Sequence, residues 1–376
     1  MKNNSLIVFV LIFCSLFLQK THAVEYGETD TNSLKTKIPS FVKPEFDYWM
    51  RDTWVTTGPD GYYYMTGTTA DPERQFSGQP HCWDWNDGLY LWKSKNLKKW
   101  EAVGLIWSME RDGTWQKNPK IHPEGAKYPT KSINGDTLDN RFHALWAPEL
   151  HYIKSLKNWF VVACMNASAG GRGSFVLKSM SGKPEGPYVN IAGNEQHPLF
   201  PEIDGSLFED TDGTVYFVGH NHYIARMKPD MSGYDEEIQK LEEQSYSPEP
   251  YIEGAFIFKH EDKYHLVQAI WSHRLEGGKD TYAPEVDSNK TRYSYDCVIA
   301  TADNIYGPYG PRYTSITGGG HNNLFQDKQG NWWATMFFNP RGAQASEYKQ
   351  TCRPGIVPLK YIDGEFIPNN RKIKRR

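Results

Sequence analysis

The feature that most restricts the fold of this chain is a recurring pair of short β-rich segments joined by a tight turn. In each pair, apolar and polar residues alternate on both sides of a turn that contains Gly, Asp or Asn, which is the sequence signature of a β-hairpin. Five such units occur, at residues 54–66, 150–163, 206–218, 255–267 and 323–337. Recurring hairpins with few helices are typical of a β-propeller, in which each unit belongs to one blade.

We therefore predict an all-β fold, a five-bladed β-propeller, over residues 46–370. An N-terminal extension at 24–45 precedes it, and a short basic tail at 371–376, expected to be a solvated end, follows it. A large β-sandwich is the alternative all-β architecture, but it would not account for the recurrent inner hairpins. One helix is expected, at 234–244, and the stretch 71–140 is long enough to hold an insertion that walls a binding cleft.

The first 23 residues have the pattern of an export signal. Lys2 supplies a positive start, residues 6–18 are apolar, and Ala23 ends a small-residue cleavage site. The apolar stretch is too short to span a membrane, and no later segment is long and apolar enough to do so. We predict a signal peptide at 1–23, export to the periplasm or the cell exterior, and no membrane span.

The charge balance argues against nucleic acid as a partner. The chain has 42 Lys and Arg against 45 Asp and Glu, a formal net charge of −3, whereas nucleic-acid-binding domains are usually basic. The cysteines beyond the signal, Cys82, Cys164, Cys297 and Cys352, form no Cys-x-x-Cys pair, which disfavours zinc. Export would permit disulfides, but buried free thiols fit the wide spacing equally well.

Three acidic residues stand at or just before predicted strands, at intervals that match the blades: Asp52, Asp204 and Glu253. Two carboxylates that face each other across a sugar are the minimum for cleavage of a glycosidic bond, and a third can shift the pKa of the acid. The pattern favours a sugar-cleaving enzyme with a polysaccharide or oligosaccharide as its substrate.

Together with other motifs, these residues resemble glycoside hydrolase family 43, the five-bladed propeller β-xylosidases, α-L-arabinofuranosidases and arabinanases. The resemblance spans nearly the whole mature chain. Its marks are Arg51-Asp52-Thr53, Ser94 to Trp100, Trp146-Ala147-Pro148-Glu149, Ile203-Asp204-Gly205-Ser206, Glu253-Gly254-Ala255 and Gly320-His321-Asn322. The family often has Asp-Pro at the first of these motifs and Glu-Gly-Pro at the fifth. These departures keep the carboxylates and leave the sugar specificity open.

The resemblance implies a role for each carboxylate. Asp52 would be the general base that deprotonates a water, Glu253 the general acid that protonates the leaving oxygen, and Asp204 the group that keeps the acid protonated and holds the sugar. The structural alternatives are that Asp52 pairs with Arg51 and that Asp204 binds backbone amides at a turn. The family inverts configuration, so the base and the acid are expected to lie about 6.5–9.5 Å apart.

Further positions match substrate-binding positions of the family. Arg353 resembles the arginine that reaches into the sugar subsite near the acid, and Trp146 is expected to wall the sugar pocket. Trp54 and Trp271 are candidate platforms for a sugar ring, with burial in the core as the alternative for each.

His321 follows a run of glycines, and a histidine at this place in relatives points into the propeller axis. The resemblance implies that it can coordinate a central ion, often calcium and largely through waters. Calcium prefers oxygen ligands, so the histidine alone is weak support for a metal. No cofactor is expected for the chemistry, and a structural calcium ion on the axis is left open.

The combined prediction is an exported inverting glycosidase that releases terminal xylose or arabinofuranose from plant or algal polysaccharide or oligosaccharide. A retaining fructan-type propeller hydrolase is one alternative, but such enzymes usually carry Asn-Asp-Pro and Glu-Cys at the motifs of Asp52 and Glu253. A non-catalytic sugar-binding propeller is the other, and the presence of all three carboxylates counts against it.

Overall fold

The computed structural model describes the chain in ten ranges. These are 35–47, 49–69, 85–86, 88–117, 143–166, 171–244, 252–275, 280–281, 291–338 and 352–375. For residues 85, 143, 271–275, 280–281 and 291–294 it describes the backbone only. The predicted signal peptide lies outside these ranges. None of the helices within them is both long and apolar enough to cross a bilayer.

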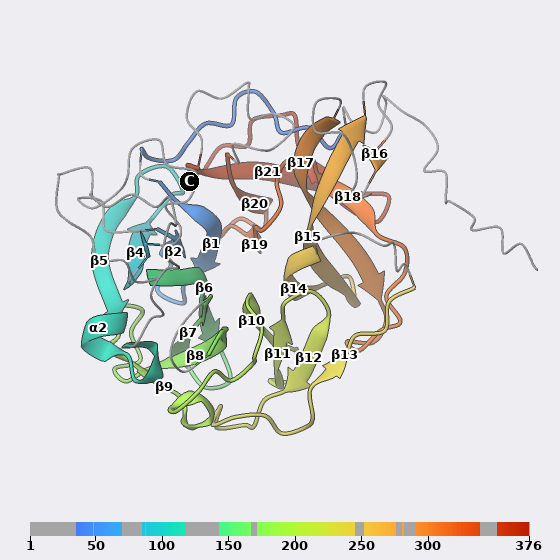
Figure 1. Cartoon of the computed structure of the whole chain (residues 1–376). Coiled ribbons are helices and arrows are strands. Elements are labelled where there is room, and N and C mark those ends of the chain that lie inside the picture. The colour runs from blue at the N-terminus through green and yellow to red at the C-terminus, as the bar shows by residue number, and fades with distance from the viewer. Residues whose placement is uncertain are drawn as a thin grey trace, which may run out of the picture.

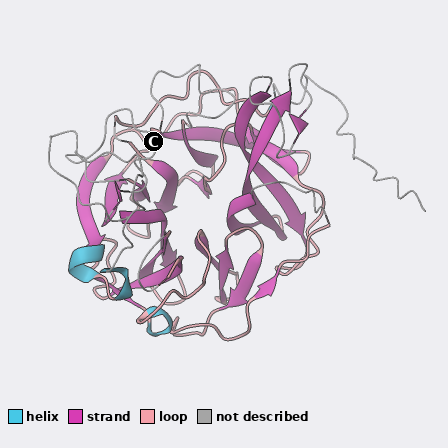
Figure 2. Ribbon diagram, viewed as in Figure 1, coloured by secondary structure: helices cyan, strands magenta, loops and turns pink. Residues whose placement is uncertain are grey.

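Five sheets surround a common centre, which confirms the predicted all-β, five-bladed propeller (Figure 1; Figure 2). Blade 1 contains β1 (Arg51–Thr57), β2 (Tyr63–Thr68), β4 (Gly88–Ser94) and β5 (Glu101–Ser108). Blade 2 contains β6 (His143–Ile153), β7 (Asn158–Met165), β8 (Gly173–Ser179) and β9 (Tyr188–Asn190), and β3 (Trp85–Asn86) pairs with β6. Blade 3 contains β10 (Gly205–Glu209), β11 (Val215–Gly219), β12 (Tyr223–Arg226) and β13 (Gln239–Lys240). Blade 4 contains β14 (Ile252–His260), β15 (Lys263–Leu275), β17 (Thr291–Ala302) and β18 (Tyr313–Ile316), and β16 (Asp280–Thr281) pairs with β15. Blade 5 contains β19 (Leu324–Gln326), β20 (Trp332–Phe337), β21 (Pro354–Ile362) and β22 (Glu365–Pro368).

Both faces of each blade are buried, because each sheet packs between two neighbours. Strand β7 illustrates the pattern. Its side chains point alternately to opposite faces, so Phe160 and Val162 join the core shared with blade 3, while Val161 and Ala163 join the core shared with blade 1. This double burial explains why β7 is a nearly continuous apolar run rather than a half-polar one.

Helices are short in the described part of the chain: α2 (Met109–Asp112), η3 (Trp115–Lys117) and η4 (Ala192–Asn194). The predicted helix at 234–244 is wrong. Within that segment Gln239 and Lys240 form β13, which pairs with β12 as the outer strand of blade 3. Pairing to a sheet edge therefore overrides the local helical tendency of an acidic, Leu- and Gln-containing segment.

The stretch 71–140 is only partly the insertion that we predicted. Strands β4 and β5 lie within it and complete blade 1, whereas 70–84 and 118–142 lie outside the described residues. The thiols of Cys164, Cys297 and Cys352 are free and buried, and Cys82 also falls outside the described ranges.

The ring closes between blade 1 and blade 5 without a shared strand in the part of the chain that the structure describes. Asn323 links the two blades: its side-chain amide donates to the carbonyl of Val55 at 2.8 Å and its Oδ1 accepts from the N–H of Val55 at 3.0 Å. Beyond the five blades, the Arg375 guanidinium in the tail binds both carboxylate oxygens of Glu45 in the N-terminal segment, at 2.7 and 2.8 Å. The prediction of a solvated basic tail is therefore wrong at Arg375, which is fixed to the N-terminal segment.

Candidate active site

One residue with a positive φ occurs near the start of the innermost strand of each blade. These residues are Asp52 (49°), Ala147 (46°), Asp204 (60°), Gly254 (63°) and His321 (52°). For a residue with a Cβ atom this left-handed conformation is strained, and such strain concentrates at functional sites. The same left-handed turn thus recurs in all five blades. In four of them it lies at or next to a predicted catalytic carboxylate or His321: Asp52, Asp204, Glu253 or His321 itself.

His321 is the common neighbour of the three predicted catalytic carboxylates. Its Nδ1 lies 3.3 Å from Asp52 Oδ1, and its ring packs so tightly on Gly254 that a Cβ there would approach Cδ2 to 2.8 Å. Burial lowers the pKa of His321, but the charges of Asp52, Asp204 and Glu253 outweigh it, so that the pKa is raised. The structure therefore brings the three carboxylates together around one buried imidazole, whose protonated form they favour.

Asp52 has one oxygen that is held by a hydrogen bond and one that faces His321. The Thr68 hydroxyl donates to Oδ2 at 2.6 Å, and that hydroxyl itself accepts the N–H of Ala147 at 2.7 Å. Oδ1 is buried and makes no hydrogen bond. Blades 1 and 2 together thus orient the carboxylate. Sequence reasoning missed Thr68, because a threonine in a β-strand is unremarkable without knowledge of what lies beside it.

Asp204 is buried, with 4% of its surface exposed. Burial raises its pKa to about 7, against the opposing effect of His321, and the charges of Glu253 and Asp52 raise it further. Its Oδ2 makes no hydrogen bond, and the Cys164 thiol lies 3.8 Å from Oδ1. Burial therefore favours the protonated form of Asp204, which lies within electrostatic range of both Glu253 and Asp52.

Glu253 is held by a tyrosine from the same blade. The Tyr295 hydroxyl on β17 donates to Glu253 Oε1 at 2.7 Å. Burial and the charges of Glu253 and Asp52 raise the pKa of Tyr295 well above its usual value, so the phenol stays a donor. Tyr295 was also missed, since it occurs in an alternating strand segment where an aromatic residue indicates only a β core.

The structure places Arg353 beside the N-terminal segment. Its Nε donates to Asp47 Oδ1 at 3.1 Å, and 23% of its side chain is exposed. The carbonyl of the adjacent Cys352 accepts the N–H of Met50 at 2.8 Å, so Arg353 lies close to the start of β1. Trp146 is half-buried on β6, with its carbonyl 3.6 Å from the Cys164 thiol.

The two predicted stacking tryptophans have different outcomes. Trp54 is 9% exposed, and its ring lies 5.0 Å from the ring of His151 and 5.3 Å from that of Phe256. This placement favours the core alternative for Trp54. Trp271 lies on β15, where the side chain is outside the described residues.

A buried polar pair lies within electrostatic range of His321. Glu149 Oε2 and His151 Nε2 are 2.8 Å apart, and burial raises the pKa of Glu149 well above its usual value. Burial also lowers the pKa of His151 to about 3. Burial thus disfavours the charged form of both groups, which suits a bracing role for Glu149 rather than a chemical one.

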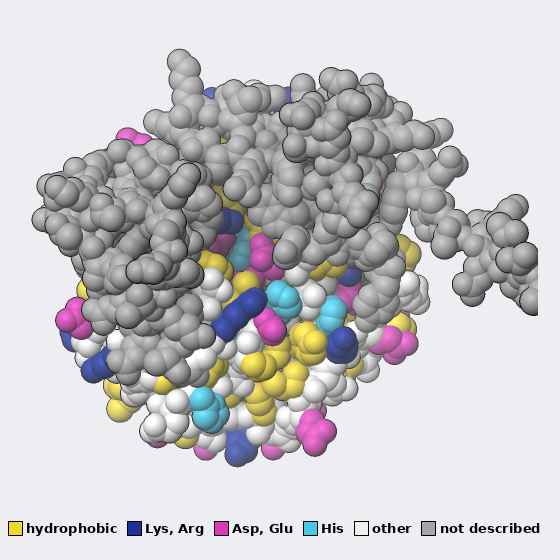
Figure 3. All heavy atoms as spheres, in the orientation of Figure 1, with side chains coloured by type: hydrophobic (Ala, Val, Ile, Leu, Met, Phe, Trp, Pro, Cys, Tyr) yellow, Lys and Arg dark blue, Asp and Glu magenta, His cyan; other side chains and the backbone are white. Residues whose placement is uncertain are grey.

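His220 lies within electrostatic range of Glu253 and was not singled out by the sequence. The group called the funnel below is formed by Asp52, Asp204, Glu253 and His321. The N–H of His220 donates to the carbonyl of Asp204 at 2.9 Å, and its own carbonyl accepts the N–H of Ala255 at 3.0 Å. Burial lowers the pKa of its half-buried ring, whose Nδ1 makes no hydrogen bond. Close by, Arg172 and Glu202 form an ion pair of 3.1 Å. In Figure 3, charged and histidine side chains gather near the middle of the visible face.

The donors around His321 do not fit direct metal binding. Nδ1 of His321 faces Asp52 Oδ1 at 3.3 Å. Among the described residues, no group of three His, Cys, Asp or Glu side chains is placed to hold a metal ion. Calcium would in any case require six to eight oxygen ligands. An axial calcium held through waters stays a prediction, and no step below depends on it.

Comparison with known proteins agrees with this fold. The family model described as "Glycosyl hydrolases family 43" matches residues 41–366. The chain therefore belongs to glycoside hydrolase family 43, a family of glycosidases, as its motifs predicted.

The individual relatives are distant. The chain is 26% identical to the β-D-galactofuranosidase xynD of Aspergillus niger, over 68% of this chain and 71% of that one. It is 24% identical to a putative β-xylosidase of Escherichia coli (72% and 47% covered) and 23% identical to the non-reducing end α-L-arabinofuranosidase BoGH43B of Bacteroides ovatus (72% and 46%). The chain thus spans about half the length of the last two.

A solved structure of a thermostable family-43 glycoside hydrolase covers 93% of this chain and 97% of its own, with a TM-score of 0.55 and 19% identity. At this identity the likeness shows the fold alone.

Proposed function

We propose that this chain is an inverting glycosidase that releases terminal xylose or arabinofuranose residues from a plant or algal polysaccharide or oligosaccharide. The observation that carries the proposal is the gathering of Asp52, Asp204 and Glu253 around His321 in a member of family 43. The names of the relatives, two of which refer to xylose or arabinofuranose, support this sugar class at low identity.

In this proposal Asp52 is the general base. Because Thr68 holds Oδ2, Oδ1 is the oxygen that receives a proton from the attacking water. The water oxygen forms a bond to the anomeric carbon on the face opposite the leaving group, while the glycosidic C–O bond breaks. One displacement without a covalent intermediate inverts the configuration of the sugar.

Glu253 is the general acid. The hydrogen bond from Tyr295 fixes Oε1, which leaves Oε2 as the oxygen that delivers the proton to the departing sugar. Asp204 lies within electrostatic range of Glu253 and is proposed to tune this acid and to hold the sugar. Arg353 and Trp146 are proposed to contact the sugar from blades 5 and 2.

We also propose that the protein is exported, with residues 1–23 as its signal peptide. N-terminal sequencing of the protein recovered from the periplasm or the medium tests this. A mature N-terminus near residue 24 supports export, and an intact residue 1 on cytoplasmic protein contradicts it.

The function itself is tested by product analysis on arabinoxylan, arabinan, galactan and algal polysaccharides. Wild-type protein should release xylose or arabinose, and Glu253→Gln should reduce the rate by about 10²- to 10⁴-fold, the usual contribution of a general acid. Glu101→Gln, which alters an exposed glutamate on β5, is the matched control and should leave the rate unchanged.

Proton NMR of the first sugar anomer formed completes the test. An inverted anomer supports the proposal, whereas a retained one would favour the fructan-type alternative. Sugar binding that is unchanged in Glu253→Gln, with no turnover of any substrate by the wild type, would identify a non-catalytic binding protein.

A further inference from the structure

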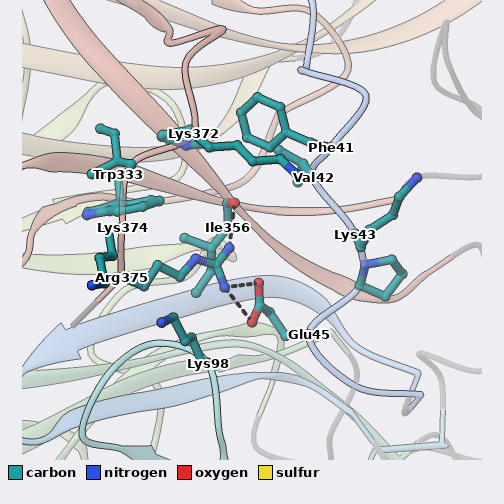
Figure 4. A pocket seen from close by; sticks show the side chains of 13 residues that line it. Phe41, Val42, Lys43, Glu45, Lys98, Trp333, Ile356, Lys372, Lys374 and Arg375 are labelled. Carbon is teal, nitrogen blue, oxygen red and sulfur yellow. Dashed lines mark hydrogen bonds and ion pairs between the residues drawn. The ribbon is translucent and has the colours of Figure 1, made fainter.

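A cavity with a volume of about 520 Å³ lies apart from the catalytic carboxylates (Figure 4). It is bounded by the N-terminal segment at 41–45, the turn at Lys98, strands β20 and β21 of blade 5, and the tail at 372–375. None of the catalytic carboxylates lines it. Its volume falls in the range of about 300–1,000 Å³ that is typical of ligand sites.

The cavity is strongly basic in a chain that is acidic overall. Its charged lining consists of Lys43, Lys98, Lys372, Lys374 and Arg375 against the single acid Glu45, a formal charge of +4, whereas the whole chain carries −3. A cleft lined by one sign of charge concentrates ligands of the opposite sign.

The one acid in the cavity does not neutralise the lysines. Figure 4 shows Arg375 bound to both oxygens of Glu45, and Arg375 also donates to the carbonyls of Leu97 at 2.7 Å and Ile356 at 3.1 Å. Within the described ranges, no carboxylate forms an ion pair with Lys43, Lys98, Lys372 or Lys374. Four ammonium groups are therefore available to a ligand, and two of them belong to the tail segment that Arg375 anchors.

Apolar surface lies between these lysines. Phe41, Pro44 and Ile373 are half-buried in the lining, and the Lys372 ammonium lies 5.6 Å from the centre of the Phe41 ring. A small inorganic anion would use only the charges. A sugar acid would use both features, because its carboxylate pairs with an ammonium and its C–H faces pack on apolar side chains.

We propose that this cavity, named here the tail groove, binds a carboxylate-bearing segment of a polysaccharide, separately from the catalytic funnel. The tail groove would hold a uronate-containing chain against the enzyme while the funnel acts on a neutral sugar. This inference goes beyond the hydrolytic function and does not depend on turnover.

The test uses full-length wild-type protein and two probes, polygalacturonate and the same polymer after reduction of its carboxyl groups. Affinity electrophoresis should show retardation by polygalacturonate that decreases with added salt, and little retardation by the reduced polymer. The double variant Lys98→Glu/Lys374→Glu should bind at least tenfold more weakly. Its control, Lys183→Glu/Lys228→Glu, reverses two exposed lysines of blades 2 and 3 and should bind like the wild type.

Three results would overturn the proposal: equal retardation by the reduced polymer, unchanged binding in the Lys98→Glu/Lys374→Glu variant, or equally tight binding of single-stranded RNA, which would indicate a general polyanion surface. Thermal unfolding confirms that the variants are folded. Glu253→Gln should keep full polygalacturonate binding, so failure of the tail groove and failure of the hydrolytic mechanism give different results.

Discussion

Buried polar atoms lack hydrogen bonds at the mouth of the funnel, where the catalytic carboxylates lie, but are paired at the seam between blades 1 and 5. At the mouth, Asp52 Oδ1 and Asp204 Oδ2 are buried without a hydrogen bond, and both residues have a left-handed backbone. At the seam, the amide of Asn323 satisfies both backbone polar groups of Val55.

A buried polar atom without a partner costs about 1–3 kcal/mol, whereas a paired one contributes about 1 kcal/mol of stability. The unpaired Asp204 Oδ2 therefore reduces the stability of the fold, whereas the seam supplies stability where no strand of the described ranges crosses between the blades. The comparison predicts that substitutions at the mouth change the rate and that those at the seam change the free energy of unfolding.

The largest effect is expected for Asp52→Asn. The amide keeps the shape and the contact with Thr68 but cannot accept the proton of the water, so the rate of hydrolysis should fall about 10³-fold with an unchanged Tm. The control is Asp60→Asn, in the turn of the same blade, where Asp60 accepts from the Tyr64 hydroxyl at 2.6 Å. It should retain the rate. An Asp52→Asn protein with wild-type activity would remove Asp52 from the mechanism.

At the seam, Asn323→Ala should lower the free energy of unfolding by about 3 kcal/mol, because it leaves two buried backbone groups of Val55 without partners. Urea denaturation measures this change. The hydrolysis rate at 25 °C should stay within about twofold of the wild type, since no catalytic group is touched. Asn304→Ala, in an exposed turn of blade 4, should cost less than about 1 kcal/mol. Loss of activity without loss of stability in Asn323→Ala would contradict the division between mouth and seam.

Asp204→Asn tests how much ionisation of the buried Asp204 carboxyl lowers the free energy of unfolding. The folded pKa of Asp204 is raised to about 7, so the folded protein keeps a proton that the unfolded chain releases above about pH 4. The associated stability is present at low pH and is lost as the pH rises through 7. Relative to Asp204→Asn, the wild type should lose about 2–3 kcal/mol of unfolding free energy between pH 5 and 8.5.

Asp212→Asn, in an exposed turn of blade 3, is the control for this series. Denaturant titrations of the three proteins across this pH range measure the difference. Parallel curves for the wild type and Asp204→Asn would show that Asp204 does not carry a raised pKa.

The smallest effect is expected for Tyr295→Phe. It removes the hydrogen bond that orients Glu253 but leaves the acid in place, so kcat should fall about tenfold while KM stays nearly constant. Tyr309→Phe removes another buried phenol, which donates to the carbonyl of Ile305 at 2.9 Å, and should affect stability without changing kcat. Equal kinetics for the two variants would make Tyr295 a purely structural residue.

The sequence was sufficient to predict the propeller, because its hairpins and buried strands are local patterns that repeat. Asp52, Asp204 and Glu253 could be found for the same reason: each follows the blade repeat and matches a family motif. The failed helix at 234–244 shows the limit of local patterns, since its strand exists only by pairing with β12.

Contacts between distant parts of the chain could not be predicted in this way. Thr68 and Tyr295 act through partners on other strands, and Arg375 binds Glu45 from 330 positions away. No local pattern distinguishes a threonine or tyrosine that orients a carboxylate from one that only packs. The same limit applies to Trp54, where a sugar platform and a core residue have the same sequence signature.

The central claim is that Glu253 is the general acid and Asp52 the general base. The most direct test compares two substrates whose leaving groups differ in their need for a proton. A dinitrophenyl glycoside needs no protonation as it departs, whereas a natural oligosaccharide does. If Glu253 is the acid and Asp52 the base, Glu253→Gln should hydrolyse the dinitrophenyl glycoside within about tenfold of the wild-type rate but lose about 10³-fold on the oligosaccharide, and Asp52→Asn should lose both activities. Equal losses of Glu253→Gln on the two substrates, or a retained activity of Asp52→Asn, would contradict the assignment of acid and base at the funnel mouth.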